Sequence, residues 1–102
     1  MNPILSSKLK AIAKLCDENK VKTLYAFGSI CSENFNKDSD VDFLLTFKPE
    51  ISIEQYTNNY FELHYELANL FNRKIDLITE RSLSNPFFIK SVNNSKQLVY
   101  ES

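Results

Sequence analysis

Two aspartates stand at the entrance to the most apolar run of this chain. Asp40 and Asp42 are separated by one residue and lead into residues 41–47, a run that apart from Asp42 is β-branched, aliphatic or aromatic. Residues two apart in a strand point to the same face, so both carboxylates lie side by side. Burying two neighbouring carboxylates without a cation costs several kcal/mol, because they repel each other and lose hydration. Hard divalent cations such as Mg²⁺ relieve that cost through oxygen ligation, which makes this strand end a candidate magnesium site.

A third carboxylate occurs in another apolar run. Asp76 lies between two aliphatic residues within residues 74–79, and this run predicts a strand. If that strand lies beside the strand of Asp42, Asp76 joins Asp40 and Asp42 on one face of the sheet. Three such carboxylates predict a site for two Mg²⁺ ions, one binding a triphosphate and the other activating an attacking hydroxyl. We therefore assign all three aspartates to metal binding and to catalysis.

The only glycine of the chain follows the earliest predicted strand. Residues 21–27 are rich in β-branched and aromatic side chains, and the predicted strand stops at Gly28, which is followed by Ser29. A residue without Cβ lets backbone N–H groups approach a phosphate closely, and a serine adds a hydroxyl donor. We predict that Gly28 and Ser29 bind the phosphates of a nucleotide. The structural alternative is a simple turn, and the combination with three aspartates at this spacing argues against it.

Periodicity and capping signals place helices around these strands. The order is a helix, two strands, a helix, a strand, a short helix and a last strand. The two early strands are joined too tightly for a crossover helix, so we expect a mixed sheet with helices packed mainly on one face. This is a small α/β (α+β) fold, and 102 residues suit one domain over 1–102. The predicted helices run from Asn2 to Cys16, from Ser52 to about Asn72 and from Asn85 to about Val92, and the last strand covers residues 97–100.

Charge and cysteine content disfavour several classes of protein. The formal net charge is −1, without the basic excess that is typical of proteins that bind long nucleic acids. Cys16 and Cys31 form neither a disulfide framework nor a metal-spaced pair. No segment has the length and apolarity of a signal peptide or a membrane span, so we expect no membrane partner. The default compartment for such a chain is the reducing cytoplasm.

Several other residues are predicted to be structural. His64, the only histidine, lies one helical turn from Tyr60, and both are expected to pack in the core or at its rim rather than to bind a ligand. Cys31 is expected to be a small buried hydrophobe, because no neighbouring base would activate it. Arg73, Lys74 and Arg81 lie at the ends of the third predicted strand, near Asp76. One of them could reach the phosphates, but solvated strand-end charges are the expected role.

The stretch FGSICSENFNKDSDVDFLL resembles the signature of the DNA polymerase beta superfamily of nucleotidyltransferases. The length of the chain and its ending, KIDLITERSLSNPFFIKSVNNSKQLVYES, resemble the minimal nucleotidyltransferases of prokaryotes. The resemblance implies that the Gly-Ser turn contacts nucleotide phosphates and that the three aspartates bind metal. It also implies a Mg²⁺-dependent protein adenylyltransferase that moves AMP from ATP to a tyrosine of a small helical HEPN-type ribonuclease toxin, and thereby acts as an antitoxin.

One part of this signature differs from the family pattern. Ile30, Cys31, Ser32 and Glu33 stand where family members often have basic residues and a second glycine, so the bidentate charge of an arginine is missing. The alternative function is therefore a catalytically weak or inactive binding module that neutralises its partner by contact. Transfer of nucleotides to an RNA end is a third hypothesis, and the charge balance disfavours it.

Overall fold

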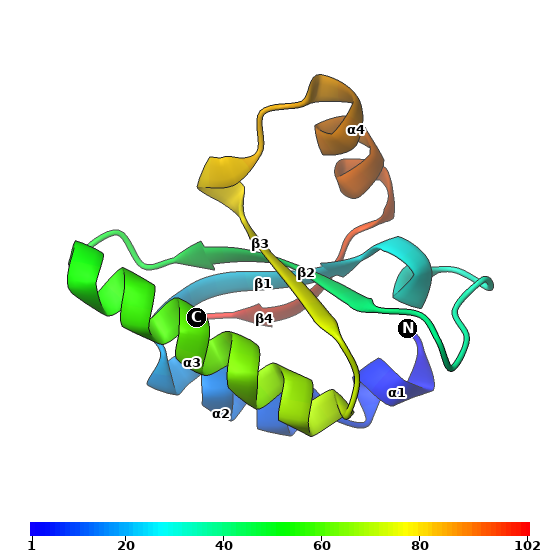
Figure 1. The fold of residues 1–102 in the computed structure, drawn as a ribbon, viewed down its shortest axis with the longest axis horizontal. Helices are drawn as coiled ribbons and strands as arrows, with labels where there is room; N and C mark the ends of the chain where they lie inside the picture. Colours follow the sequence, from blue (N-terminus) through cyan, green and yellow to red (C-terminus); the bar gives the residue numbers. More distant parts are fainter.

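The computed structural model describes all of residues 1–102 and contains one four-stranded sheet with helices on both sides (Figure 1). The strand order is β3-β2-β1-β4; β1 is antiparallel to β2 and β4, and β2 is parallel to β3. The predicted mixed α/β fold is therefore confirmed. None of the helices is long and apolar enough to cross a membrane. In chain order the elements are α1 (Pro3–Ser6), α2 (Leu9–Glu18), β1 (Val21–Phe27), the 3₁₀ helix η1 (Gly28–Cys31), β2 (Val41–Phe47), α3 (Ile53–Phe71), β3 (Ile75–Thr79), the 3₁₀ helix η2 (Glu80–Ser82), α4 (Pro86–Ser95) and β4 (Gln97–Glu101).

The sheet has a large core on one face and a small core on the other. On the first face, α2 and α3 cover the alternate residues of β2 that begin with Val41, within a cluster of 16 buried residues. On the second face, α4 places Val92 against Phe27 and Leu44. Figure 1 shows α4 on this second side, opposite α1, α2 and α3. Because Asp42 precedes Leu44 by two residues, it lies on the α4 face.

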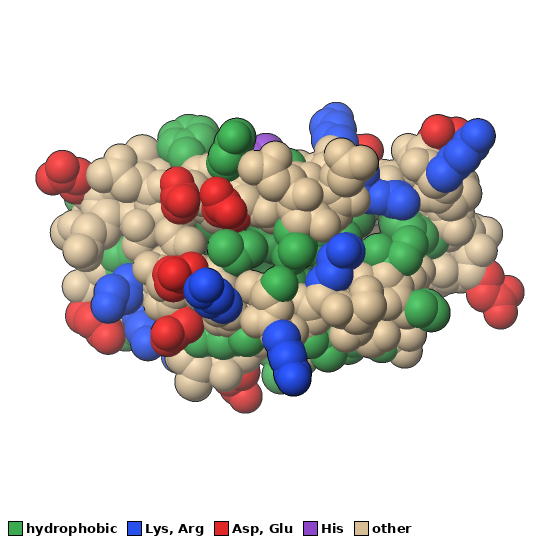
Figure 2. Space-filling model, turned by 90° about the horizontal axis from the view of Figure 1, so that it is seen from below, with side chains coloured by type: hydrophobic (Ala, Val, Ile, Leu, Met, Phe, Trp, Pro, Cys, Tyr) green, Lys and Arg blue, Asp and Glu red, His purple; other side chains and the backbone are tan.

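The helical layer formed by α1, α2 and α3 provides most of the apolar burial. Figure 2, which views the molecule from this side, shows hydrophobic side chains along the middle of the face and charged side chains around them. Ile12 of α2 and Leu63 and Leu67 of α3 are fully buried against the sheet. The opposite face carries less apolar cover and is the one that presents polar side chains of the strands.

Helix α3 begins and ends where its capping residues predict. Ser52 Oγ accepts a hydrogen bond from Gln55 N at 3.1 Å, as expected for an N-cap. The C-cap residue Asn72 adopts the left-handed conformation with φ 51°, which ends the helix and lets the chain reverse into β3. A helical crossover of this kind is what two parallel neighbouring strands require.

The N-terminal helix is the main difference from the predicted elements. Instead of one helix, the chain forms α1 and α2, separated by Ser7 and Lys8. The Ser7 hydroxyl donates to the carbonyl of Ile4 at 3.1 Å, and such local bonds compete with continuation of a helix. The break leaves Leu5 fully buried in the large core. Helix α4 also continues about one turn beyond its predicted end, to Ser95.

Candidate active site

Strand register brings two of the predicted site residues together. In the parallel pairing of β2 with β3, Asp42 and Asp76 are direct partners. Partners in adjacent strands point to the same face, so both carboxylates lie on the side of the sheet that α4 covers in part. On the other flank of β2, Asp42 pairs with Phe27, the last residue of β1. The two aspartates therefore meet at the end of the sheet where β1 stops and β2 and β3 begin.

Gly28 lies directly against one of these carboxylates. Its φ is 77°, in the left-handed region that favours glycine. A Cβ on this residue would lie 2.4 Å from Asp42 Oδ2, so a larger residue forces that carboxylate to move. Ser29 follows in η1, where its carbonyl accepts a hydrogen bond from Ser32 N at 2.9 Å. The turn predicted to bind phosphates thus borders the carboxylate pair.

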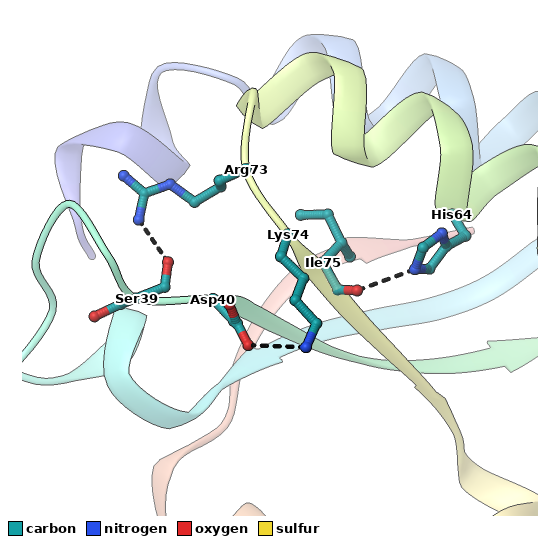
Figure 3. Close-up of polar contacts among 6 residues, drawn as sticks. All are labelled: Ser39, Asp40, His64, Arg73, Lys74 and Ile75. Atoms are coloured by element: carbon teal, nitrogen blue, oxygen red, sulfur yellow. Dashed lines mark hydrogen bonds and ion pairs between the residues drawn. The ribbon is translucent and has the colours of Figure 1, made fainter.

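Asp40 pairs with Lys74 and does not converge with the other two aspartates. Its Oδ2 lies 3.8 Å from Lys74 Nζ, as Figure 3 shows, and the two side chains are 44% and 78% exposed, respectively. No three acidic, histidine or cysteine side chains converge as a ready-made metal site. An ion pair this exposed contributes at most about 1 kcal/mol. Breaking this ion pair, so that Asp40 rotates toward Asp42, therefore costs little free energy.

The electrostatics of Asp42 nevertheless fit a cation. Burial, followed by the negative charges of Asp76 and Asp40, raises the pKa of Asp42 to about 6. A raised carboxyl pKa means that the folded protein disfavours the negative charge at this position. Carboxylate oxygens are also the donors that Mg²⁺ prefers. The three aspartates fit Mg²⁺ by donor type and by charge, although the three side chains do not converge on one point.

Arg73 anchors the loop that leads into Asp40. Its Nη1 donates to the carbonyls of Ser39 and Asn36 at 2.8 and 3.1 Å, and Figure 3 shows the bond to Ser39. The guanidinium also lies 4.5 Å from the centroid of the Phe35 ring. The prediction of a solvated strand-end charge is therefore wrong for Arg73. No local signal could have found these contacts, because their partners are 34 and 37 positions away in the chain.

His64 has the structural surroundings predicted for it, whereas Cys31 is only partly buried and not the buried hydrophobe predicted. Cys31 Sγ donates to the carbonyl of Ala26 at 3.4 Å, and burial raises the pKa of its thiol. A protonated thiol is a poor nucleophile. His64 Nε2 lies 3.0 Å from the carbonyl of Ile75, and its ring stacks beside that of Tyr60 with centroids 6.4 Å apart.

The raised pKa of Asp42 predicts a pH-dependent stability of the metal-free protein. Its pKa is 3.8 as a model value and about 6 in the fold, so the folded state binds the proton more tightly. The group therefore favours folding below about pH 4, and this contribution is lost as the pH rises to about 6. After allowance for solvent screening we expect a loss of about 1–2 kcal/mol. Urea unfolding of the wild type and of Asp42→Asn at pH 4 and pH 7 measures it; parallel pH profiles of the two proteins would contradict the expectation.

Residues 10–102 match the family model described as polymerase beta, nucleotidyltransferase. The chain belongs to this nucleotidyltransferase family. A Methanocaldococcus jannaschii relative named "Putative protein adenylyltransferase MJ1217" is 36% identical over 93 residues, which cover 91% of this chain and 87% of the relative. A second relative from that organism, "Putative protein adenylyltransferase MJ0126", is 33% identical over 87 residues, or 85% of this chain and 83% of the relative.

Solved structures share the nucleotidyltransferase fold of this chain. One, described as "Structure of putative minimal nucleotidyltransferase", superposes with a TM-score of 0.73 at 24% identity and covers 91% of this chain and 90% of that one. A crystal structure of a toxin-antitoxin with AMP-PNP gives a TM-score of 0.70 at 23% identity, covering 92% and 73% of the two chains. A tri-AMPylated Shewanella oneidensis HEPN toxin in complex with its MNT antitoxin gives 0.66 at 21% identity, covering 96% and 73%.

Proposed function

We propose that this nucleotidyltransferase is a Mg²⁺-dependent protein adenylyltransferase, in which residues 1–102 form a single domain. It transfers AMP from ATP to a hydroxyl of a protein partner, with a tyrosine as the acceptor. The partner is a small helical HEPN-type ribonuclease toxin, for which this chain is the antitoxin. The observation that carries the proposal is the pairing of Asp42 with Asp76 beside the turn at Gly28.

The proposed reaction is a substitution at the α-phosphorus of ATP. The tyrosine oxygen forms a bond to this phosphorus, the bond from the phosphorus to the oxygen bridging to the β-phosphate breaks, and pyrophosphate leaves. The hydroxyl proton passes to a carboxylate of the site. Gly28 and Ser29 position the phosphates through backbone N–H groups and the serine hydroxyl. Asp40, Asp42 and Asp76 would hold Mg²⁺, which when bound supplies positive charge for the triphosphate and for the deprotonated hydroxyl.

The comparisons support a protein acceptor. The M. jannaschii relatives are named as protein adenylyltransferases, and one structural neighbour is a complex with an AMPylated HEPN toxin. The site of this chain is also open, because Asp76 is exposed on an edge strand of the sheet. An acceptor side chain on another protein reaches such a surface without entering a deep pocket.

A direct test uses ATP labelled at the α-phosphate. With Mg²⁺ and the proposed HEPN-type toxin, we expect label on the toxin, and none after removal of Mg²⁺ with EDTA. The double variant Asp40→Asn, Asp42→Asn should give no label. Asp38→Asn is the matched control, since Asp38 is an exposed acidic residue of the same loop and should keep full transfer. Labelled RNA in place of labelled protein would favour the RNA-end hypothesis instead.

A contact-only antitoxin is the second candidate. Ile30 is 1% exposed and belongs to the core, so position 30 offers no side chain to a phosphate. Glu33 is exposed and adds negative charge after the turn. Growth of cells that express the toxin separates the two functions. If the Asp40→Asn, Asp42→Asn variant still protects these cells, contact is sufficient and transfer is not required.

A further inference from the structure

The strand that carries Asp76 is held by backbone pairing on one side only. β3 is an edge strand, and its one neighbour in the sheet is β2. On that side Val41 N donates to the carbonyl of Lys74 at 3.1 Å. Because successive peptide groups of a strand point in opposite directions, the carbonyls of Ile75 and Leu77 face away from β2. An edge strand normally leaves such groups to water or to another strand.

Two side chains of α3 form hydrogen bonds with these outward-facing carbonyls. The Tyr60 hydroxyl donates to the carbonyl of Leu77, and His64 Nε2 bonds to the carbonyl of Ile75 at 3.0 Å, as Figure 3 shows for His64. Tyr60 and His64 are one helical turn apart, and their rings stack at an interplanar angle of 24°. Side chains of α3 therefore form hydrogen bonds with the carbonyls of the residues immediately before and immediately after Asp76.

We propose that Tyr60 and His64 are positioning residues, which set where the Asp76 carboxylate stands relative to Asp42. This inference rests on the proposed function of the carboxylate site. Asp76 is exposed, so its position depends on the backbone of β3 rather than on side-chain packing. With β2 on one side and the two α3 side chains on the other, the peptide units around Asp76 are fixed on both sides. Metal sites are sensitive to such support, since loss of an outer partner weakens metal binding about 10–100-fold.

Packing alone does not explain the two polar groups. Leu63 and Leu67 are fully buried and attach α3 to the core without help from its polar residues. Burial, followed by the negative charge of Asp76, raises the pKa of Tyr60, so its hydroxyl stays protonated and keeps donating. His64 donates from Nε2 both in the neutral tautomer that carries its proton on Nε2 and in the imidazolium form. The two anchors therefore persist over the pH range in which the carboxylates are ionised.

The test compares matched variants in the full chain, with Mn²⁺ alone as the probe. Tyr60→Phe removes the hydroxyl, while Tyr65→Phe makes the same change on the same helix at a side chain that is 63% exposed. His64→Leu removes the second donor, and His64→Gln keeps an N–H donor on the side chain. By calorimetry we expect about tenfold weaker Mn²⁺ binding for Tyr60→Phe and His64→Leu, with Tyr65→Phe and His64→Gln within about twofold of the wild type.

A second readout separates positioning from loss of fold. The metal concentration that gives half-maximal AMP transfer should rise in parallel with the Mn²⁺ dissociation constant, while the KM for the protein acceptor stays unchanged. Urea unfolding of each variant gives its folded fraction. The variants His64→Gln and His64→Leu replace the same side chain, one with an N–H donor and one without. Equal metal binding by Tyr60→Phe, His64→Leu and the wild type would overturn the inference, as would absence of metal binding by the wild type. Metal binding without AMP transfer would instead remove the proposed function and leave the positioning role to be decided by the dissociation constants.

Discussion

Replacing Asp42 with asparagine is expected to abolish AMP transfer and, at the same time, to stabilise the metal-free protein. Asp42 is the carboxylate that lies between the Gly28 turn and Asp76, and asparagine keeps its shape while removing its charge. Loss of the charge removes a metal ligand, and we expect transfer to fall by about 1,000-fold, which corresponds to about 4 kcal/mol.

The stabilisation has a separate physical cause. Burial and two acidic neighbours oppose ionisation of Asp42, so its charge is unfavourable in the metal-free fold at pH 7. Asp42→Asn should therefore raise the free energy of unfolding by about 1–2 kcal/mol at pH 7. An inactive enzyme that is more stable than the wild type is not the signature of a damaged fold.

Three measurements check this prediction: label transfer from ATP to the partner, urea unfolding at pH 7, and thermal unfolding with and without Mg²⁺. Mg²⁺ should raise the unfolding temperature of the wild type and leave that of Asp42→Asn almost unchanged. Asp38→Asn should behave as the wild type in all three. Full transfer by Asp42→Asn would remove Asp42 from the catalytic site.

Gly28→Ala is expected to have the second largest effect, through the same carboxylate. The added Cβ would meet Asp42 Oδ2 at 2.4 Å, and the end of that side chain is what must shift. A shift of the carboxylate away from Gly28 changes its position relative to Asp76, its partner in β3. The backbone at φ 77° adds about 1–2 kcal/mol of strain for a residue with a Cβ.

We expect transfer by Gly28→Ala to fall about 100-fold, more than the loss of stability explains, since a displacement near 1 Å has effects of this size. Asn72→Ala is the matched control, because position 72 is also left-handed, with φ 51°, at the end of α3. That variant should lose a similar amount of stability and keep its activity at a temperature where it is folded. If both variants lose activity in proportion to their stability, steric displacement of Asp42 is not the cause.

The elements of this fold are largely predictable from short stretches of sequence. The runs that form β1 and β2 are rich in the β-branched, aliphatic and aromatic residues that favour strands, and both have the predicted bounds. The N-cap at Ser52 is a signal contained within a few residues, and the start of α3 agrees with it. The break between α1 and α2 was not predictable in this way, because an unbroken apolar stripe crosses it and the competing serine bonds are weak signals.

The candidate site is different, because its residues lie far apart in the chain. Asp42 and Asp76 face each other only because β2 and β3 are parallel neighbours in register, and a shift of one residue would have put them on opposite faces. The ion pair between Asp40 and Lys74 also joins two segments that lie far apart in the sequence.

The sequence alone determines which acidic residues are candidates for the site, where the glycine turn lies and which strands carry them. Each of these depends on side-chain chemistry and on neighbours within a few positions. Only the tertiary structure decides that Gly28 touches Asp42, that Arg73 holds the loop before Asp40, and that Tyr60 and His64 grip the strand of Asp76. The physical reason is that hydrogen bonds and steric contacts act over a few ångströms in space, whatever the separation along the chain.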